Sequence, residues 1–207
     1  MISVETTVLI LLAAGKSERM GDVGSKLDQP FLSRPLGLHV AVALGDMPFR
    51  RRCAVVSDSC ALDYAPLGFE MLTNSDPARD LSSSVRLGIE CARGCDPAAV
   101  LIALADMPRV TATHIYRMLD AAHGDDAVVA SSNGFHPTPP AIFGRAHFDT
   151  LASLTGDEGA NRLIKAGRHV VTNAAELIDV DTPDELEQLR ALVHAPEALS
   201  RPGTMRF

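Results

Sequence analysis

Apolar and polar positions along the chain alternate in blocks that predict strands and helices in turn. Short continuous apolar runs that end in polar loops are typical of strands buried on both faces of a parallel sheet. Between these runs, apolar residues recur every three or four positions, which is typical of amphipathic helices. The predicted strands are 7–12, 52–56, 69–73, 99–104 and 127–130, with an edge strand at 169–172. The predicted helices are 35–44, 82–92, 111–122, 146–154, 158–166 and 183–193.

This alternation predicts a three-layer α/β fold with a mostly parallel sheet. The chain has 207 residues, of which 46% are hydrophobic, so it can enclose one sizeable core. We therefore expect a single domain over residues 1–194 and a loosely attached tail over 195–207, where two prolines interrupt the pattern. The proline-rich segment 131–140 is expected to form a loop, because proline lacks a backbone donor and restricts its neighbours.

The net charge and the hydropathy of the chain limit the kinds of partner that it is expected to bind. A formal net charge of −7 argues against non-specific binding to nucleic acid, because most of the surface would repel the phosphates. The apolar segment Val8–Leu12 is too short to span a bilayer. Glu5 precedes it at a place where a signal peptide carries basic residues. We therefore expect a cytoplasmic protein with neither a nucleic-acid nor a membrane partner.

The four cysteines are too scattered to suggest a zinc site. None forms a CxxC pair, and two of them are one helical turn apart beside a glycine. We interpret all four as reduced thiols rather than as members of a disulfide or a zinc site. They are Cys53, Cys60, Cys91 and Cys95.

The loop after the first predicted strand combines glycines, a serine and three cations. Its sequence is LLAAGKSERMGDVGSKL, residues 11–27. Glycines let the backbone approach a ligand closely, and Lys16, Arg19 and Lys26 bring positive charge, which suits a polyphosphate. Composition alone also fits a flexible, basic, solvated segment. The position favours a ligand site, because ligands of open α/β sheets bind beyond the carboxyl ends of the strands.

Acidic residues occur in two other segments that should end near this loop. Asp106 lies just beyond the predicted strand 99–104, and Asp179 and Asp181 precede the last predicted helix. Mg²⁺ takes one or two carboxylates together with phosphate oxygens and water, which sparse aspartates can supply. Each aspartate taken alone also fits a helix cap or a turn. Together they predict a magnesium site that faces a phosphate-binding loop.

Three segments occur in a distinctive order. They are LLAAGKSERMG followed by Lys26, then ADMP at 105–108, and finally the run FGRAHFDTLASLTGDEGANRLI leading to LIDVDTPDEL. In this order they resemble the MobA-like nucleotidyltransferases, and especially their molybdenum cofactor cytidylyltransferase branch. The resemblance covers residues 8–189. It implies a Rossmann-like fold of the nucleotide-diphospho-sugar transferase type, and Mg²⁺-dependent transfer of a nucleoside monophosphate from a triphosphate to a phosphorylated acceptor such as molybdopterin.

The resemblance also implies roles for individual residues. Arg19, Lys26 and Asp106 would be catalytic, with the two cations holding the phosphates. Asp106 would bind Mg²⁺, with either Asp181 or Asp179 as the second ligand. The nucleotide would be bound by Ala13, Ala14, Gly15, Ser17, Arg19, Lys26, Ser82, Ser83 and Ser84. Relatives that transfer guanylate carry a second glycine in the opening loop, whereas this chain has alanines, so the resemblance favours CTP over GTP.

The chain departs from the family pattern at three points, one of which is Asp28-Gln29-Pro30, where the family often has a leucine-rich continuation. Ala105 stands where the central motif usually has glycine, and the spacing from Gly21 to Lys26 is longer than in many members. These departures leave open a cofactor-binding or delivery module for a molybdenum enzyme, with little transferase activity. A sugar-phosphate nucleotidyltransferase is a further alternative, because that larger group shares the fold. His136 matches a family region near the acceptor pocket, and it also fits an exposed structural histidine.

Overall fold

The computed structural model describes residues 1–15, 24–77, 80–156 and 160–194. Two of the residues predicted to bind the nucleotide, Ser17 and Arg19, lie outside these ranges, as does the predicted tail at 195–207. Within the described ranges, no helix has the length and apolar character needed to cross a membrane.

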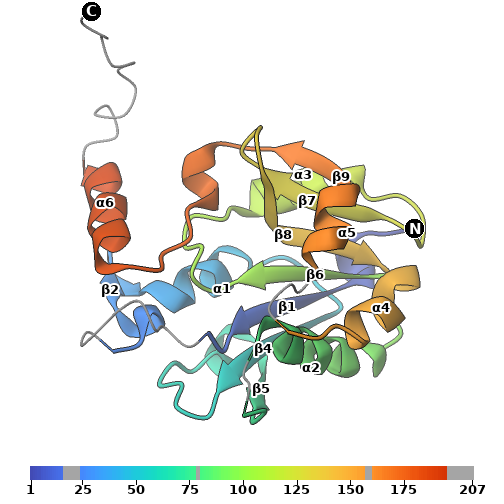
Figure 1. The fold of residues 1–207 in the computed structure, drawn as a ribbon, viewed down its shortest axis with the longest axis horizontal. Helices are drawn as coiled ribbons and strands as arrows, with labels where there is room; N and C mark the ends of the chain where they lie inside the picture. Colours follow the sequence, from blue (N-terminus) through green and yellow to red (C-terminus); the bar gives the residue numbers. More distant parts are fainter. Residues whose placement is uncertain (16–23, 78–79, 157–159, 195–207) are drawn as a thin grey trace, which may run out of the picture.

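A seven-stranded sheet forms the middle layer of the described part of the chain (Figure 1). Its strands lie in the order β5, β4, β1, β6, β8, β7, β9. Neighbouring strands are parallel except where β8 pairs antiparallel with β6 and β7. The predicted α/β fold with a mostly parallel sheet is therefore confirmed. The strands are β1 (Thr7–Ala13), β4 (Arg51–Ser57), β5 (Glu70–Asn74), β6 (Ala99–Leu104), β7 (Val128–Ser132), β8 (Pro137–Gly144) and β9 (Arg168–Val171).

Helices cover both faces of this sheet. Leu9 and Leu11 of β1 pack in a core cluster that includes side chains of α1 and α3. Val8 and Ile10, on alternate positions of the same strand, pack in a second cluster with α2, α4 and α5. Because successive side chains of a strand point to opposite faces, β1 is buried on both sides. The helices are α1 (His39–Ala43), α2 (Leu81–Arg93), α3 (Ala112–Ala121), α4 (Phe148–Ala152), α5 (Asn161–Ala166) and α6 (Pro183–His194).

The last helix packs against a small hairpin rather than against the sheet. The hairpin strands β2 (Pro30–Phe31) and β3 (Arg34–Pro35) pair with each other. A third apolar cluster joins this region to α6 through five buried side chains, which are Phe31, Leu36, Val180, Leu186 and Leu189. This cluster fixes the segment before α6. The remaining described elements are the 3₁₀ turns η1 (Val4–Thr6), η3 (Lys26–Asp28), η4 (Leu36–Leu38), η5 (Ala65–Leu67), η6 (Arg145–His147) and η7 (Ala174–Leu177).

The predicted helix 35–44 is wrong in its first turn. Pro35 belongs to β3, η4 follows it, and the α-helix begins at His39. Gly37 explains the irregular start, because a Cβ there would lie 2.8 Å from Leu62 Cδ1 and 2.9 Å from Leu27 Cβ. The backbone at Gly37 is thus pressed against its tertiary neighbours. The spacing of apolar residues along the sequence does not reveal this packing.

The predicted loop at 131–140 is confirmed only for residues 133–136 and is wrong at both of its ends. β7 continues to Ser132, and β8 begins at Pro137 and includes the cis bond between Pro139 and Pro140. The pairing of β8 with β6 ends at Ala141, so residues 137–140 extend past β6. Prolines are tolerated there, because a strand without a partner on one side needs no backbone donor on that side. The pairing with β7 shifts register between Ala130 and Ser131, where the two strands accommodate this segment.

The two helices predicted at 146–154 and 158–166 are shorter than their apolar spacing indicates. Residues 145–147 form η6, so α4 begins only at Phe148. α5 begins at Asn161, and residues 157–159 lie outside the described ranges. The other strand and helix predictions agree with the structure to within a few residues at each end.

His114 gives the fold a pH dependence. It lies buried in α3, and its Nε2 is 2.8 Å from the hydroxyl of Ser131, which donates to the carbonyl of Pro140. Nε2 therefore carries the proton, whereas the buried Nδ1 has no hydrogen-bond partner among the described residues. Burial lowers the pKa of His114, because a second proton would place an unpaired charge in the core.

We expect the free energy of unfolding to fall as the pH decreases from 7 to 5.5. Below its ordinary pKa, His114 takes up a proton more readily in the unfolded chain than in the folded one, so acid favours unfolding. The slope is limited to about 1.4 kcal/mol per pH unit for one group. Urea unfolding at several pH values measures it. His114→Gln should flatten the slope, whereas the exposed His123→Gln should leave it unchanged.

Candidate active site

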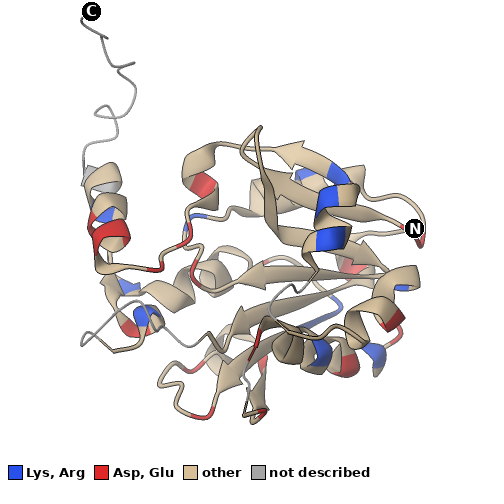
Figure 2. Cartoon of the chain, in the orientation of Figure 1, with Lys and Arg blue, Asp and Glu red and all other residues tan. Residues whose placement is uncertain are grey.

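Lys26 contacts two aspartates, one beyond the carboxyl end of β6 and one just before α6. Its Nζ lies 2.6 Å from Asp106 Oδ2 and 2.6 Å from Asp181 Oδ1. Lys26 begins η3, Asp106 follows β6, and Asp181 precedes α6. In Figure 2 the acidic segments of the loop after β6 and of the loop before α6 lie near each other. The structure thus brings together three residues that the sequence places far apart.

Two members of the cluster are shielded from water, whereas the side chain of Asp181 is 29% exposed. The side chains of Lys26 and Asp106 are 9% and 18% exposed. Burial alone would lower the pKa of Lys26, but the two carboxylates outweigh this effect and raise that pKa, so the ammonium stays charged. Burial also raises the pKa of Asp106, an effect that the ammonium opposes and the negative charges of Asp179 and Asp181 reinforce.

These residues fit a divalent cation. Two carboxylates, those of Asp106 and Asp181, face the same ammonium. Asp106 Oδ1 is buried and has no hydrogen-bond partner among the described residues. A buried oxygen without a partner is costly, and a cation would satisfy it. Carboxylate oxygens are the ligands that Mg²⁺ and Mn²⁺ prefer.

The backbone before α6 holds Asp181 in place. The amide of Val180 donates to the carbonyl of Asp106 at 3.0 Å, which ties this segment to the loop after β6. The amides of Asp181 and Thr182 both donate to Glu185 Oε2, at 2.9 and 2.8 Å, and these bonds lower the pKa of Glu185. The Thr182 hydroxyl accepts from the Glu185 amide at 3.3 Å, so Thr182 caps the last helix.

A cavity of about 160 Å³ opens beside Lys26 and Asp106. Ala13, Ala14 and Gly15 form one wall, where β1 ends. Both alanines are buried, and their methyl groups pack into the two cores on opposite faces of the sheet. A methyl group on Gly15 would meet no described atom within 4 Å, so the backbone there is open to an approaching ligand. The other lining residues are Leu12, Leu27, Asp80, Leu81, Ser84 and Leu104.

The three predicted serines are placed differently from one another. Ser84 lines the cavity, and the side-chain amide of Asn74 donates to its hydroxyl at 3.0 Å. The Ser82 hydroxyl donates to the carbonyl of Gly156, and the Ser83 hydroxyl donates to the carbonyl of Asp80. Ser82 and Ser83 therefore use their hydroxyl protons to hold the first turn of α2 in place.

Sequence reasoning missed Asp80, which caps α2 and lines the cavity. Its carboxylate accepts from the amide of Ser83 at 2.6 Å, and this bond lowers the pKa of Asp80. Asn74, at the end of β5, was missed as well and is buried against Ser83 and Ser84. An aspartate directly before a run of small residues is a helix-start signal that could have identified Asp80.

Two of the departures from the family pattern, Ala105 and the longer spacing before Lys26, leave this geometry intact. Ala105 is buried in the core on the α1 and α3 face, and its amide donates to the carbonyl of Leu12 at 3.0 Å. It is not among the described residues that line the cavity. Lys26 reaches Asp106 despite the longer spacing from Gly21.

Comparison with known proteins agrees with this arrangement. Residues 9–172 match the family described as the MobA-like NTP transferase domain. The chain belongs to this family. It therefore has the fold of a MobA-like domain, and family membership supports nucleotidyl transfer as its general activity.

Three relatives are informative about the extent of this likeness. The purine catabolism protein PucB of Bacillus subtilis (strain 168) is 29% identical over 197 residues, which cover 87% of this chain and 94% of PucB. The bifunctional protein GlmU of Rhizorhabdus wittichii is 34% identical over 139 residues. The match covers 66% of this chain and 30% of GlmU. Rv0371c from Mycobacterium tuberculosis H37Rv has been solved in complex with manganese, and its structure matches with a TM-score of 0.69 at 22% identity. The match covers 89% of this chain and 98% of the Rv0371c chain.

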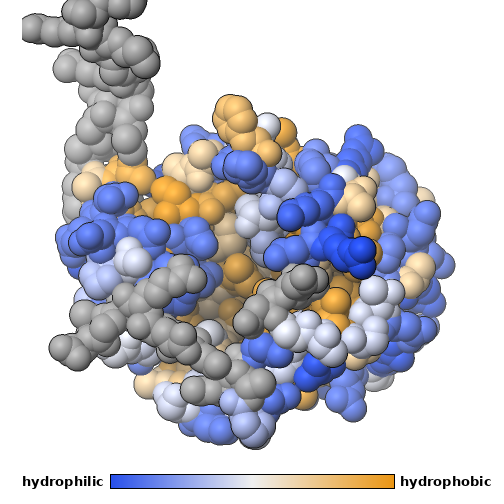
Figure 3. Space-filling view, in the orientation of Figure 1, coloured by the Kyte–Doolittle hydropathy of each residue, from blue (hydrophilic) through white to orange (hydrophobic). Residues whose placement is uncertain are grey.

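A second, larger cavity of this MobA-like domain lies beside α6 and has a volume of about 820 Å³. Asp179 lines it, whereas Asp181, two residues later, contacts Lys26. His136 and Asn133, from the segment between β7 and β8, form the opposite wall and are exposed. In Figure 3 apolar residues gather between α6 and the η7 turn. The apolar lining residues are Ala174, Leu177, Ile178, Leu189, Ala191 and Leu192.

Proposed function

We propose that this chain uses a divalent cation, with Mg²⁺ as the expected ion, to transfer CMP from CTP to a molybdopterin-type acceptor. The contact of Lys26 with both Asp106 and Asp181 carries this proposal, because it places a cation and two carboxylates beside the cavity at the end of β1. Family membership supports a nucleoside triphosphate as the substrate. The manganese in the Rv0371c structure supports a divalent cation.

In this proposal each residue has a defined task. The backbone of Ala13, Ala14 and Gly15 lies against the triphosphate, and Lys26 neutralises its charge. Ser17 and Arg19 extend the same loop. Asp106 and Asp181 hold the cation, since Asp181 contacts Lys26 whereas Asp179 lines the neighbouring cavity. When bound, such an ion supplies positive charge that stabilises the phosphate oxygens.

The reaction needs no side chain to remove a proton. A phosphate oxygen of the acceptor attacks the α-phosphorus of CTP, a new P–O bond forms, and the bond to the β-phosphate breaks, releasing pyrophosphate. An ionised phosphate is already a nucleophile, so the protein mainly positions the reactants and neutralises the developing charge. This task suits buried cations and carboxylates in a shielded cavity.

The larger cavity is the proposed binding site of the acceptor. Its volume of about 820 Å³ lies in the range of cavities that bind organic ligands. Its lining combines apolar side chains with a few polar ones, which suits a molecule with a flat organic part and a phosphate. The segment 178–181 contributes to both sites, so an acceptor held there would lie next to the nucleotide.

Pyrophosphate release tests this proposal. The full chain is incubated with Mg²⁺ or Mn²⁺, each of the four nucleoside triphosphates, and either the molybdenum cofactor or a sugar 1-phosphate. We expect release with CTP and the molybdenum cofactor. Release with GTP alone would overturn the base preference, and release with the sugar phosphate alone would overturn the acceptor. Acceptor binding by calorimetry, without nucleotide binding or turnover, would indicate a module that delivers the cofactor to a molybdenum enzyme.

Gly15→Ala should weaken nucleotide binding without affecting folding. A methyl group at this position enters open space at the cavity wall, where the triphosphate is proposed to lie. We expect KM for CTP to rise about tenfold, which corresponds to ~1.4 kcal/mol, with a smaller change in kcat. Steady-state kinetics measure both constants.

Gly88→Ala is the contrasting variant. A Cβ at Gly88 would lie 2.5 Å from Ile10 Cγ2, deep between α2 and β1. We expect this overpacking to cost about 1–3 kcal/mol of stability, whereas Gly15→Ala should change it by less than about 0.5 kcal/mol. If Gly15→Ala unfolds as readily as Gly88→Ala, the glycine is needed for the fold rather than for the nucleotide.

A further inference from the structure

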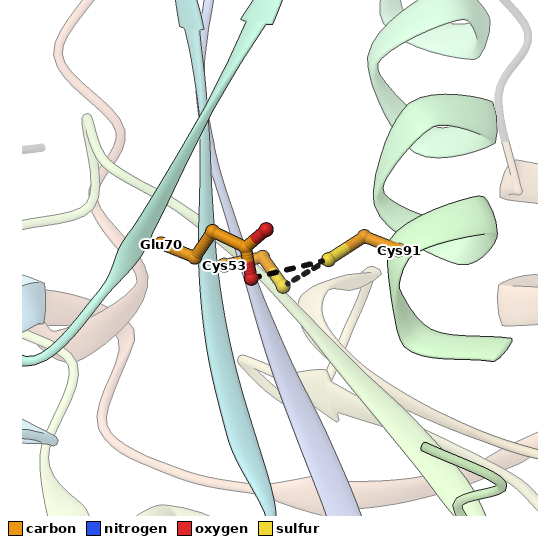
Figure 4. A group of neighbouring side chains, drawn as sticks. All are labelled: Cys53, Glu70 and Cys91. Atoms are coloured by element: carbon orange, nitrogen blue, oxygen red, sulfur yellow. Dashed lines mark hydrogen bonds between the residues drawn. The ribbon is translucent and has the colours of Figure 1, made fainter. Parts of the chain in front are cut away.

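Two thiols and a carboxylate meet where α2 packs on the sheet, away from both cavities (Figure 4). Cys53 Sγ of β4 lies 2.9 Å from Cys91 Sγ, in the last turns of α2. Glu70, the first residue of β5, pairs with Cys53 across the strands. Its Oε2 is 3.8 Å from Cys91 Sγ. The cysteines are separated by 38 positions in sequence, so their contact depends on the tertiary fold.

The two thiols differ in access to solvent. Cys53 is fully buried, whereas Cys91 is only partly buried. Burial and the contact with Cys91 raise the pKa of Cys53, so this thiol keeps its proton. Cys91 faces the Glu70 carboxylate rather than the interior of the core. A small oxidant from solvent therefore reaches Cys91 first, with Cys53 directly behind it.

Arg51 makes this cluster poorly suited to a metal ion. Its guanidinium pairs with Glu70 and donates to the carbonyl of Cys91 at 3.2 Å. A metal held by both cysteines and Glu70 would have to displace this cation or bind beside it.

We propose that Cys53 and Cys91 form a reversible disulfide when the protein meets hydrogen peroxide. The Cys91 sulfur attacks one peroxide oxygen, the O–O bond breaks, and the other oxygen leaves as water, which yields a sulfenic acid on Cys91. The Cys53 sulfur then attacks the Cys91 sulfur, the S–O bond breaks, and a second water leaves. The two thiols lose two electrons and two protons in total, and the peroxide is reduced to two molecules of water.

The disulfide would fasten the far end of the helix that lines the candidate active site. α2 begins beside the smaller cavity, where Asp80, Leu81 and Ser84 lie, and Cys91 sits near its other end. Crosslinking positions 38 apart restricts the unfolded chain. We expect the oxidised protein to have a Tm roughly 5–10 °C above that of the reduced protein.

Mass spectrometry of the full chain tests the proposal. The reduced, metal-free protein is treated with one equivalent of hydrogen peroxide, and the remaining thiols are alkylated. We expect an intact mass lower by two hydrogen atoms before alkylation, a peptide that joins Cys53 to Cys91, and full reversal by dithiothreitol. Cys91→Ser and Cys53→Ala should prevent the crosslink. Cys95→Ser is the matched control, because Cys95 follows the same helix and should leave the crosslink intact.

The wild-type peptide map decides the outcome even if a variant fails to fold. A crosslink to Cys60 or Cys95, or oxygen added to Cys91 without a crosslink, would overturn the proposal. Binding of one Zn²⁺ per reduced chain, lost in Cys91→Ser and protecting both thiols from alkylation, would identify a metal site and overturn it as well.

Discussion

Asp106→Asn should reduce nucleotidyl transfer by about 1,000-fold or more. Asparagine keeps the shape of the side chain but removes a negative charge from the pair that faces Lys26. Loss of several kcal/mol of electrostatic stabilisation in the transition state corresponds to a factor of this size. The measurement is kcat/KM for pyrophosphate release, together with calorimetric binding of Mn²⁺.

The fold of Asp106→Asn should survive, because Lys26 keeps its contact with Asp181. A thermal unfolding midpoint close to that of the wild type would therefore accompany the loss of activity. Asp149→Asn is the matched control, since this exposed carboxylate pairs with Arg93 at the surface and should leave activity unchanged. Full activity in Asp106→Asn would remove this residue from the proposed cation site.

Lys26→Met should destabilise the protein by about 3 kcal/mol and abolish transfer. Removing one member of a buried ionic cluster leaves uncompensated charge, which typically costs about 3–5 kcal/mol. Here the carboxylates of Asp106 and Asp181 would face each other without the ammonium that lies 2.6 Å from both. Urea unfolding measures the loss of stability, and pyrophosphate release measures the loss of activity.

Added Mn²⁺ should restore part of the stability of Lys26→Met. A cation that binds the folded state alone raises its stability by mass action, and the variant offers that cation two carboxylates that have lost the ammonium of Lys26. The rise in Tm with Mn²⁺ should thus exceed the rise in the wild type. Lys165→Met is the control, because this lysine is exposed on α5 and should respond like the wild type. An equal response in all three proteins would argue against a cation site between the aspartates.

The elements that were predicted best are those that depend on residues close to one another in the sequence. The continuous apolar run 99–104 coincides with β6, because a strand covered on both faces needs apolar residues at every position. The start of the last helix is also set by neighbours in sequence, since Thr182 and Glu185 contact each other within one turn. Patterns that depend on neighbours in sequence can be found in the sequence.

The features that were missed depend on distant parts of the chain. The strand β8 contains three prolines, and only its pairing with β7 makes an extended conformation favourable there. The irregular start of the helix after Pro35 follows from the packing of Gly37 against Leu62 and Leu27. Neither the partner strand nor the packed side chains are visible from the local residue pattern.

The sequence alone determined that strands and helices alternate, that a glycine-rich loop with cations follows the first strand, and that aspartates follow β6 and precede α6. The tertiary structure decided that Lys26 lies between Asp106 and Asp181, which are 80 and 155 positions away. It also decided that the thiols of Cys53 and Cys91 meet behind α2. The physical reason is the same in both cases. Burial of both faces of the sheet brings strand ends and helices together in space, and their separation along the sequence does not show how close they will be.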